Sequence, residues 1–138
     1  MLDRLKIGVL GAGNIGEALI SGLVKASLVE AKQLMASRRS EVALAYLADT
    51  YGIRTTTDNC ELVLENDIII LAAKPQILPS ILEDTEHCFR PGQVVITVAA
   101  GISTAFVESW VKNDIPVIRV MPNTPALVGQ AMSPYCLG

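Results

Sequence analysis

Three glycines near the start of the chain have the spacing of a phosphate-binding turn. The sequence KIGVLGAGNIG (residues 6–16) places Gly11, Gly13 and Gly16 directly after an apolar run. Gly11 permits a tight turn, Gly13 leaves room for a pyrophosphate beside the backbone, and Gly16 lets the next helix lie close to the strand. The free N–H groups at the start of that helix favour an anion. The pattern predicts a dinucleotide-binding turn; a purely structural strand-to-helix turn is the alternative.

Two arginines, and no carboxylate, follow the second expected strand, at the position that contacts the adenosine ribose of a bound dinucleotide. In a unit that selects NAD, an acidic residue is expected there, about twenty residues after the glycines. Here the sequence is Ser37-Arg38-Arg39-Ser40, and the next acidic residue, Glu41, is expected on the following helix. A hydroxyl and two guanidinium groups suit a 2′-phosphate. We therefore predict NADP over NAD; the alternative is two solvated turn arginines and binding without ribose discrimination.

Other polar residues give weaker indications. Lys74 follows an unbroken apolar run, where it either meets cofactor charge or extends along the surface as an ordinary lysine. Asn59 either caps a helix or reaches the cofactor. His87 is the only histidine, and its position beside Cys88 in a strand-to-strand crossover favours a packing or surface role over catalysis. The sequence identifies no catalytic residue.

Strand-like and helix-like segments alternate along the whole chain. This order predicts a Rossmann-type, doubly wound α/β fold with a mostly parallel six-stranded sheet, helices on both faces and right-handed crossovers. The expected strands are residues 6–10, 33–37, 54–56, 67–72, 94–98 and 117–120, and the expected helices are residues 14–26, 40–51, 58–65, 77–88 and 103–112. We expect the glycine turn and residues 72–75, 98–101 and 121–125, which follow strands, to meet at the crevice between the first and fourth strands.

Composition sets the class of protein. The 138 residues suit one domain, and the net charge of −3 indicates neither a nucleic-acid partner nor a membrane surface. An anionic cofactor must therefore meet local positive groups. We expect no signal peptide and no membrane span. Cys60, Cys88 and Cys136 are far apart and odd in number, which predicts a cytoplasmic, reducing location, no disulfide and no metal site.

Six blocks, in this order and spacing, resemble pyrroline-5-carboxylate reductase. They are the glycine turn, MASRR, TTDN, LAAKPQ, VAAGIS and RVMPNTPALVG, and they cover nearly the whole chain. MPNTPA and AxKPQ are much more specific than the glycine motif. The resemblance implies an oxidoreductase that reduces the imine 1-pyrroline-5-carboxylate to L-proline with NADPH or NADH, in proline biosynthesis. Two small departures are AAK in place of the family's AVK, and Gln130-Ala131 where an acidic residue and glycine are common.

The resemblance also implies which residues bind the cofactor. The implied positions are Leu10, Gly11, Ala12, Gly13, Asn14 and Ile15 around the pyrophosphate; Ser37, Arg38 and Arg39 at the 2′-phosphate; Asn59 on the cofactor; Ala72, Ala73, Lys74, Pro75, Val98, Ala99 and Ala100 along the ribose and nicotinamide; and Met121, Pro122 and Asn123 below the nicotinamide. No metal ligand and no catalytic residue is implied within this chain.

The length of the family's chains is the one large departure. Those chains are about twice as long, and their second half is a helical domain that forms an interlocked dimer and carries most imine-binding groups. We therefore expect residues 1–138 to be an NADP-binding domain without the substrate and dimerisation domain, and residues 133–138 not to continue into a further strand. The alternatives are a non-catalytic dinucleotide-binding module and another Rossmann oxidoreductase, acting on a hydroxy acid or a deazaflavin, against which MPNTPA argues.

Overall fold

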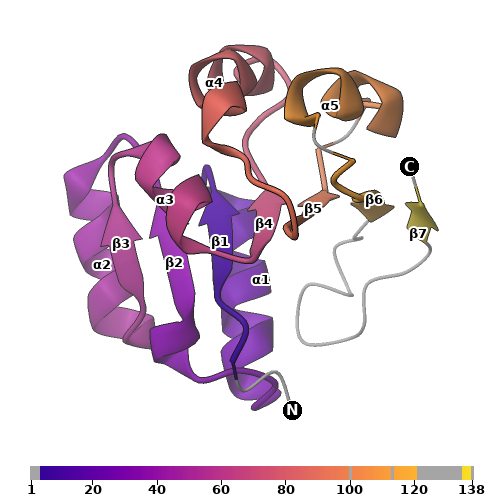
Figure 1. Cartoon of the computed structure of the whole chain (residues 1–138). Coiled ribbons are helices and arrows are strands. Elements are labelled where there is room, and N and C mark those ends of the chain that lie inside the picture. The colour runs from indigo at the N-terminus through magenta and orange to yellow at the C-terminus, as the bar shows by residue number, and fades with distance from the viewer. Residues whose placement is uncertain (1–3, 100, 113, 121–134, 138) are drawn as a thin grey trace.

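Strands and helices alternate along the chain in the structure (Figure 1). It is a computed structural model, and it describes residues 4–99, 101–112, 114–120 and 135–137. The strands are β1 (Ile7–Leu10), β2 (Leu34–Ser37), β3 (Arg54–Thr56), β4 (Ile68–Leu71), β5 (Val94–Thr97), β6 (Val117–Val120) and β7 (Tyr135–Leu137). The helices are α1 (Asn14–Lys25), α2 (Glu41–Tyr51), α3 (Asn59–Glu65), α4 (Leu78–Thr85) and α5 (Thr104–Val111), with short 3-10 helices η1 (Ala31–Gln33) and η2 (Glu86–Cys88).

The strands lie in the order β3-β2-β1-β4-β5-β6-β7. The first six are parallel, and Val9 in β1 pairs with Ala36 of β2 on one side and Ile70 of β4 on the other. The predicted doubly wound, mostly parallel sheet is confirmed, with its change of direction between β1 and β4. The expectation that residues 133–138 add no strand was wrong, because β7 pairs antiparallel with β6. A strand of three residues is too short to show an alternating pattern in sequence.

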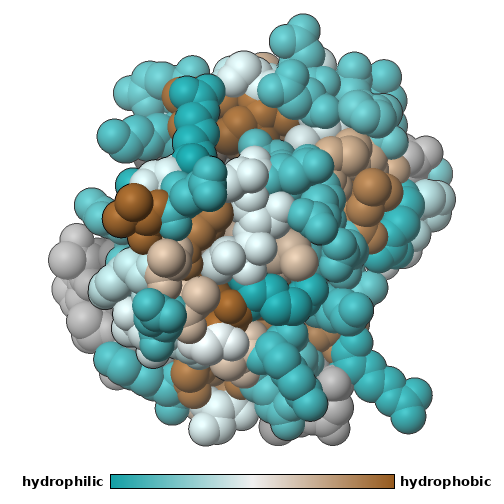
Figure 2. Space-filling model, turned by 90° about the vertical axis from the view of Figure 1, so that its left-hand side faces the viewer, coloured by the Kyte–Doolittle hydropathy of each residue, from teal (hydrophilic) through white to brown (hydrophobic). Residues whose placement is uncertain are grey.

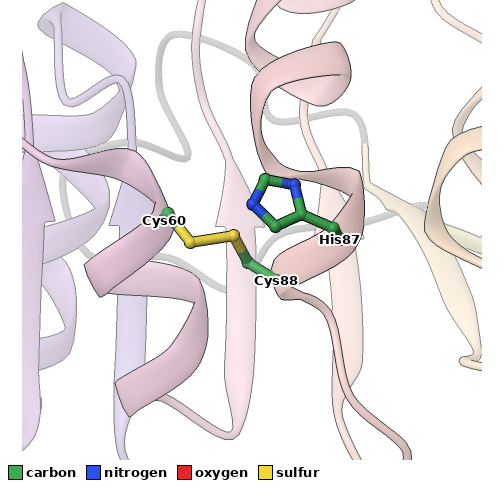
Figure 3. Close-up of side chains that lie close together, drawn as sticks. All are labelled: Cys60, His87 and Cys88. Atoms are coloured by element: carbon green, nitrogen blue, oxygen red, sulfur yellow. A yellow bond between two sulfur atoms is a disulfide. The ribbon is translucent and has the colours of Figure 1, made fainter.

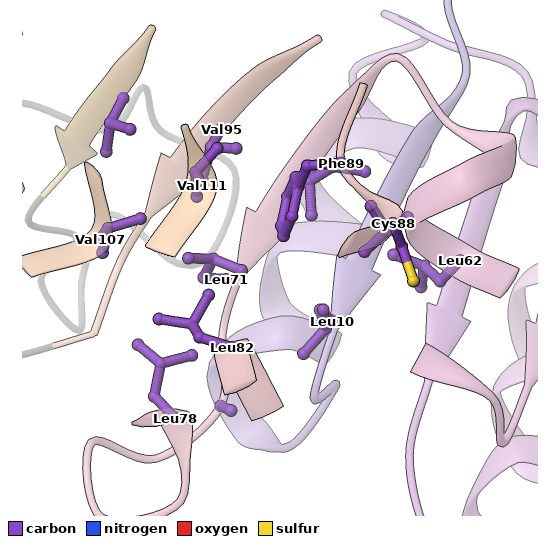
Figure 4. Close-up of a cluster of buried hydrophobic side chains, with 14 of the residues drawn as sticks. Leu10, Leu62, Leu71, Leu78, Leu82, Cys88, Phe89, Val95, Val107 and Val111 are labelled. Atoms are coloured by element: carbon purple, nitrogen blue, oxygen red, sulfur yellow. The ribbon is translucent and has the colours of Figure 1, made fainter. Parts of the chain in front are cut away.

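Two apolar layers, one on each face of the sheet, hold the helices. Because side chains alternate along a strand, Val9 of β1 points toward α1 and α2, whereas Leu10 points toward α3, α4 and α5. Figure 4 shows the second layer, where Leu71 of β4 and Leu82 of α4 lie in the same cluster. Helices on both faces were predicted, and continuous apolar strands such as β4 are typical of a sheet covered on both sides.

Local hydrogen bonds fix the ends of the helices. Ser40 and Ser103 cap α2 and α5, because each hydroxyl accepts a hydrogen bond from the N–H three residues later, at 3.1 Å in both cases. Gly52 ends α2 with a φ of 75°, which glycine adopts without strain. The predicted helix over residues 77–88 is instead α4 followed by the tighter η2.

The surface over α2 and β3 is mixed in character. Figure 2 shows hydrophobic residues there in separate groups between hydrophilic ones. Val42 and Tyr46, on the outer side of α2, are exposed. Within the described part of the chain, none of the helices has the length and hydropathy needed to cross a membrane.

Candidate functional site

A cavity of about 860 Å³ opens at the carboxyl ends of the central strands, a size typical of small-molecule sites. It brings together the glycine turn after β1, the arginines after β2, and the segments after β4 and β5. The predicted meeting of these segments is confirmed for the residues that the structure describes. The lining consists of Gly11, Gly13, Asn14, Ile15, Arg38, Arg39, Ser40, Thr57, Asn59, Ala72, Ala73, Lys74, Pro75, Ile77, Ser80, Ile81, Asp84, Val98 and Ala99.

The glycine turn is built around two close approaches and one open position. Gly11 has a φ of +78°, and a Cβ there would lie 2.6 Å from the Cβ of Ala73. At Gly16 a Cβ would lie 3.2 Å from Cγ1 of Val9, so α1 packs tightly on β1. A Cβ on Gly13 would meet nothing within 4 Å. The turn therefore leaves space beside Gly13, where the sequence predicted room for a pyrophosphate.

The start of α1 faces this space. Its N-cap is Gly13, which has no side chain to accept hydrogen bonds from the first N–H groups of the helix. The first three backbone N–H groups of a helix have no acceptor within it, and they carry part of the positive end of the helix dipole. Asn14 and Ile15, the first two residues of α1, line the cavity. This end of the cavity is suited to a phosphate group.

The two arginines after β2 form a basic side of the cavity. Arg38 and Arg39 are both exposed, and Nη1 of Arg38 donates a hydrogen bond to the carbonyl of Ala12 at 3.5 Å, which directs it toward the glycine turn. The Ser37 side chain is fully buried, and its Oγ accepts a hydrogen bond from the N–H of Gly11 at 3.3 Å. Ser37 therefore supports the turn from behind the lining, and of the two serines beside these arginines it is Ser40 that lines the cavity.

Asn59 and Lys74 line the cavity from α3 and from the segment after β4. Asp58 is the residue that caps α3, since its Oδ1 accepts from the N–H groups of Cys60 and Glu61, so Asn59 is not the cap. Lys74 is exposed, and its side chain adds a third positive charge to those of the two arginines. Asp84 is the one carboxylate in the described lining. The lining is therefore basic although the chain as a whole is acidic.

The sequence prediction missed the contribution of α4 and of Ile77, the residue just before it. Ile77, Ser80, Ile81 and Asp84 all line the cavity. Their spacing of three, four and seven residues places them on one side of a helix, so the pattern was present in the sequence. The sequence prediction did not include these residues because it placed the site at the strand ends alone. Ser40 and Thr57 were also missed.

The remaining predicted positions fall into three groups. Leu10 and Ala12 are buried behind the cavity lining, as Ser37 is. Val98 and Ala99 line the cavity and are each 5 % exposed. Four further predicted positions lie outside the described residues: Ala100, Met121, Pro122 and Asn123.

A second cavity, of about 320 Å³, lies between α1 and α2, away from the strand ends. Beside it, Oε2 of Glu17 accepts hydrogen bonds from the hydroxyls of Tyr46 and Tyr51, at 2.8 and 2.9 Å. The hydrogen bond to Glu17 raises the pKa of Tyr46. Burial, and then the same acceptor, raises the pKa of Tyr51. This group joins α1 to α2 and contains no side chain aimed at the larger cavity.

The expectation of no disulfide was wrong. The structure joins Cys60 of α3 to Cys88 of η2, and their Cα atoms are 5.7 Å apart (Figure 3). The two cysteines are 28 residues apart in sequence, but α3 packs against η2, so spacing along the chain gave no indication of their contact. The side chain of His87 lies beside them: one of its ring nitrogens and the two sulfur atoms all lie within 4.8 Å of one another.

Comparison with known families shows which family the chain belongs to. Residues 6–101 match the family model described as NADP oxidoreductase, coenzyme F420-dependent. The chain belongs to this family. The matched residues include the glycine turn, both arginines and the segments after β4 and β5, and so all of the described cavity lining.

The family's relatives confirm the resemblance seen in the sequence. The chain is 40% identical over 132 residues to the pyrroline-5-carboxylate reductase of Methanosarcina acetivorans, covering 96% of this chain and 49% of that protein. It is 35% identical over 139 residues to pyrroline-5-carboxylate reductase 1 of Bacillus spizizenii, covering 100% of this chain and 47% of that protein. The chain thus spans about half the length of the curated relatives it matches.

A solved structure shares the fold. The Plasmodium falciparum pyrroline carboxylate reductase, solved with NADP bound, superposes with a TM-score of 0.83 at 29% identity. The match covers 98% of this chain and 48% of that chain.

Proposed function

We propose that this chain is the NADP-binding domain of a reductase that converts 1-pyrroline-5-carboxylate to L-proline. The observation that carries the proposal is the similarity to pyrroline-5-carboxylate reductases over nearly all of the chain, together with the cavity at the carboxyl edge of the sheet. The residues of the cavity fit a dinucleotide: Gly13 faces open space, α1 begins there without a side-chain cap, and the lining is basic.

NADP is preferred over NAD in this proposal because of the residues after β2. Arg38 and Arg39 line the cavity next to the glycine turn, and no carboxylate follows β2 before Glu41, the first residue of α2. A guanidinium is permanently charged and binds phosphate with two parallel hydrogen bonds, so it favours a 2′-phosphate. The relative solved with NADP bound supports the same cofactor.

A bound reduced nicotinamide supplies a hydride to the carbon of a C=N bond. In this proposal Gly13 and the start of α1 hold the pyrophosphate, and Asn59 and Lys74 hold the ribose side. Ala73, Val98 and Ala99 form the apolar end of the cavity, where they exclude water from the nicotinamide face. Ala100, Met121, Pro122 and Asn123 are proposed, from the family resemblance alone, to continue that end.

The imine substrate needs groups beyond those that the structure describes. No acid is placed at the apolar end of the described cavity lining, where Val98 and Ala99 lie. We propose that imine binding and homo-oligomer formation belong to a helical domain that completes the enzyme in its longer relatives. A cytoplasmic location is proposed from the same biosynthetic role.

Fluorescence titration with NADPH, followed by an oxidation assay with 1-pyrroline-5-carboxylate on the same sample, tests the proposal. We expect NADPH to bind more tightly than NADH, because only NADPH presents a phosphate to the arginines. Failure to bind either dinucleotide would overturn the proposal. Turnover would place enough of the substrate site within this chain, whereas binding without turnover would assign the substrate groups to another domain.

Another coenzyme is the second candidate, because the description of the matching family model names coenzyme F420. A deazaflavin also carries phosphate, so the glycine turn alone does not separate the two. Titration of the same sample with coenzyme F420 distinguishes them. Binding of F420 that NADPH does not displace would favour a deazaflavin-dependent oxidoreductase.

A further inference from the structure

Two cysteines and a histidine form a cluster on the face of the sheet that α3 and α4 cover. Cys60 lies in the first turn of α3, Cys88 ends η2, and His87 precedes Cys88 (Figure 3). The Cα atoms of the two cysteines are 5.7 Å apart, the separation usual for a disulfide. None of the three residues lines the large cavity, so the proposed cofactor site does not account for them.

The two cysteines differ in their exposure to solvent. Cys88 is 2 % exposed and belongs to the apolar cluster that contains Leu62 and Phe89, whereas Cys60 is half-buried and His87 is exposed. Thiol–disulfide exchange requires a thiolate to attack one sulfur directly, so access decides which sulfur reacts. A small thiol in solution therefore reaches Cys60 first. The imidazole of His87 lies beside both sulfurs, within reach of a thiol proton.

The contact between α3 and η2 does not depend on the bond. Leu62 and Val63 of α3 pack in one cluster with Leu82 of α4 and Phe89, which follows η2. Burial of these side chains holds the two segments together in the reduced protein as well. The thiols thus remain neighbours after reduction, and the bond can form and open in the folded chain.

We propose that Cys60 and Cys88 are a reversible redox pair, in which Cys60 exchanges with small-molecule thiols and disulfides and Cys88 resolves the mixed disulfide. In oxidation, the Cys60 thiolate attacks a small disulfide such as oxidised glutathione and releases one thiolate. The Cys88 thiolate then attacks Cys60 Sγ and releases the second. The two cysteines lose two electrons and two protons, and the small disulfide becomes two thiols. Reduction reverses each step.

The pair is connected to the wall of the large cavity. Asn59, the neighbour of Cys60, lines that cavity, and so do Ser80 and Asp84 of α4, the helix that leads into η2. Closing the bond therefore ties together two segments of the wall. If the proposed function holds, the pair lies next to the wall of the cofactor site; the sulfur chemistry itself does not depend on that function. Disulfides in a reducing compartment are usually transient or redox-sensing.

Differential alkylation of the full chain across a series of glutathione ratios tests the pair. Samples are quenched with one alkylating reagent, reduced, labelled with a second of different mass, and analysed by peptide mass spectrometry. We expect the peptides of Cys60 and Cys88 to change together from the first label to the second along the series. A parallel sample digested without reduction should contain the two peptides as one cross-linked species, and Cys136 should stay outside that link. Free thiols at both positions under the most oxidising ratio would overturn the proposal.

Three variants define the roles. In Cys88→Ser, Cys60 should accumulate as a mixed disulfide with glutathione; in Cys60→Ser, Cys88 should react about tenfold or more slowly because it is buried. His87→Gln should slow exchange several-fold. Equal rates for the two single-cysteine variants would contradict the assigned order.

A zinc-binding measurement is a second, independent test of the redox pair. The reduced chain is incubated with Zn²⁺, desalted and measured for bound metal and for thiol alkylation. The proposal expects no retained zinc. One equivalent that protects both thiols and is lost in His87→Gln would overturn the redox assignment in favour of a metal site, since two thiolates and an imidazole also suit zinc.

Discussion

Gly11 and Ala73 approach so closely that a Cβ on Gly11 would lie 2.6 Å from the Cβ of Ala73. The first residue follows β1 and the second lies in the segment after β4, so this contact marks the point where the strand order reverses. The crevice at such a point is where open α/β sheets bind their ligands. The close contact closes the floor of the crevice, and the open side of Gly13 leaves room above it.

Substitutions of these two glycines should therefore have opposite kinds of effect. Gly11→Ala combines a positive φ with a collision against Ala73, and we expect a loss of about 2–4 kcal/mol in the free energy of unfolding. A Cβ at Gly13 meets nothing within 4 Å, so in Gly13→Val the chain should keep its stability while NADPH and NADH binding fall below detection. Urea unfolding and dinucleotide titration separate the two. Unchanged affinity in a folded Gly13→Val would refute the pyrophosphate turn.

Charge reversal at Arg38 or Arg39 tests the 2′-phosphate assignment. Arg38→Glu, or Arg39→Glu, should weaken NADPH binding by several-fold to a hundredfold, on the order of 1–3 kcal/mol, and NADH binding far less. The matched control is Lys32→Glu, an exposed lysine before the opposite end of β2, which changes the net charge equally. Affinities for both dinucleotides are compared at fixed ionic strength. An equal loss for NADPH and NADH would contradict the assignment.

The fold could be predicted from the sequence because the patterns that determine its turns, strands and helix ends each span only a few residues. The residues around Gly11, the unbroken apolar run of β4 and the serine caps at Ser40 and Ser103 each act over a few positions. Right-handed crossovers then allow few arrangements of the strands. The edge at which the cavity opens follows from that topology, so the segments that line it could be named before the structure.

Side-chain direction and long-range packing could not be predicted in this way. The hydroxyl of Ser37 turns back to Gly11 instead of toward the cavity, a difference in rotamer that the sequence does not encode locally. The contact of Cys60 with Cys88 depends on how α3 packs against η2, and no pattern in either segment indicates it. Both features depend on how segments distant in sequence pack together, which the spacing of residues does not encode.

The pairing of Glu17 with two tyrosines predicts a pH-dependent contribution to stability. The folded chain raises the pKa of Tyr46 and Tyr51, so it holds both phenolic protons more tightly than the unfolded chain. This contribution is complete below the ordinary tyrosine pKa of about 10 and is lost as the pH rises through the folded values. Glu17→Gln should lower both pKa values, measured by tyrosinate absorbance, and reduce the alkaline loss of stability. Tyr46→Phe isolates the titration of Tyr51.

Closing the Cys60–Cys88 bond should stabilise the folded chain. The bond closes a loop spanning 28 residues of sequence separation, for which the entropy of the unfolded chain predicts a gain of about 3–4 kcal/mol. Urea unfolding of the oxidised and reduced chain measures this gain, and the double variant Cys60→Ser/Cys88→Ser is the control, since its midpoint should not respond to reductant. Equal midpoints for the oxidised and reduced chain would show that the bond adds no restriction to the unfolded chain. In that case α3 and η2 would stay in contact even in the unfolded state. A gain near the predicted value would instead show that the bond acts by restricting the unfolded chain.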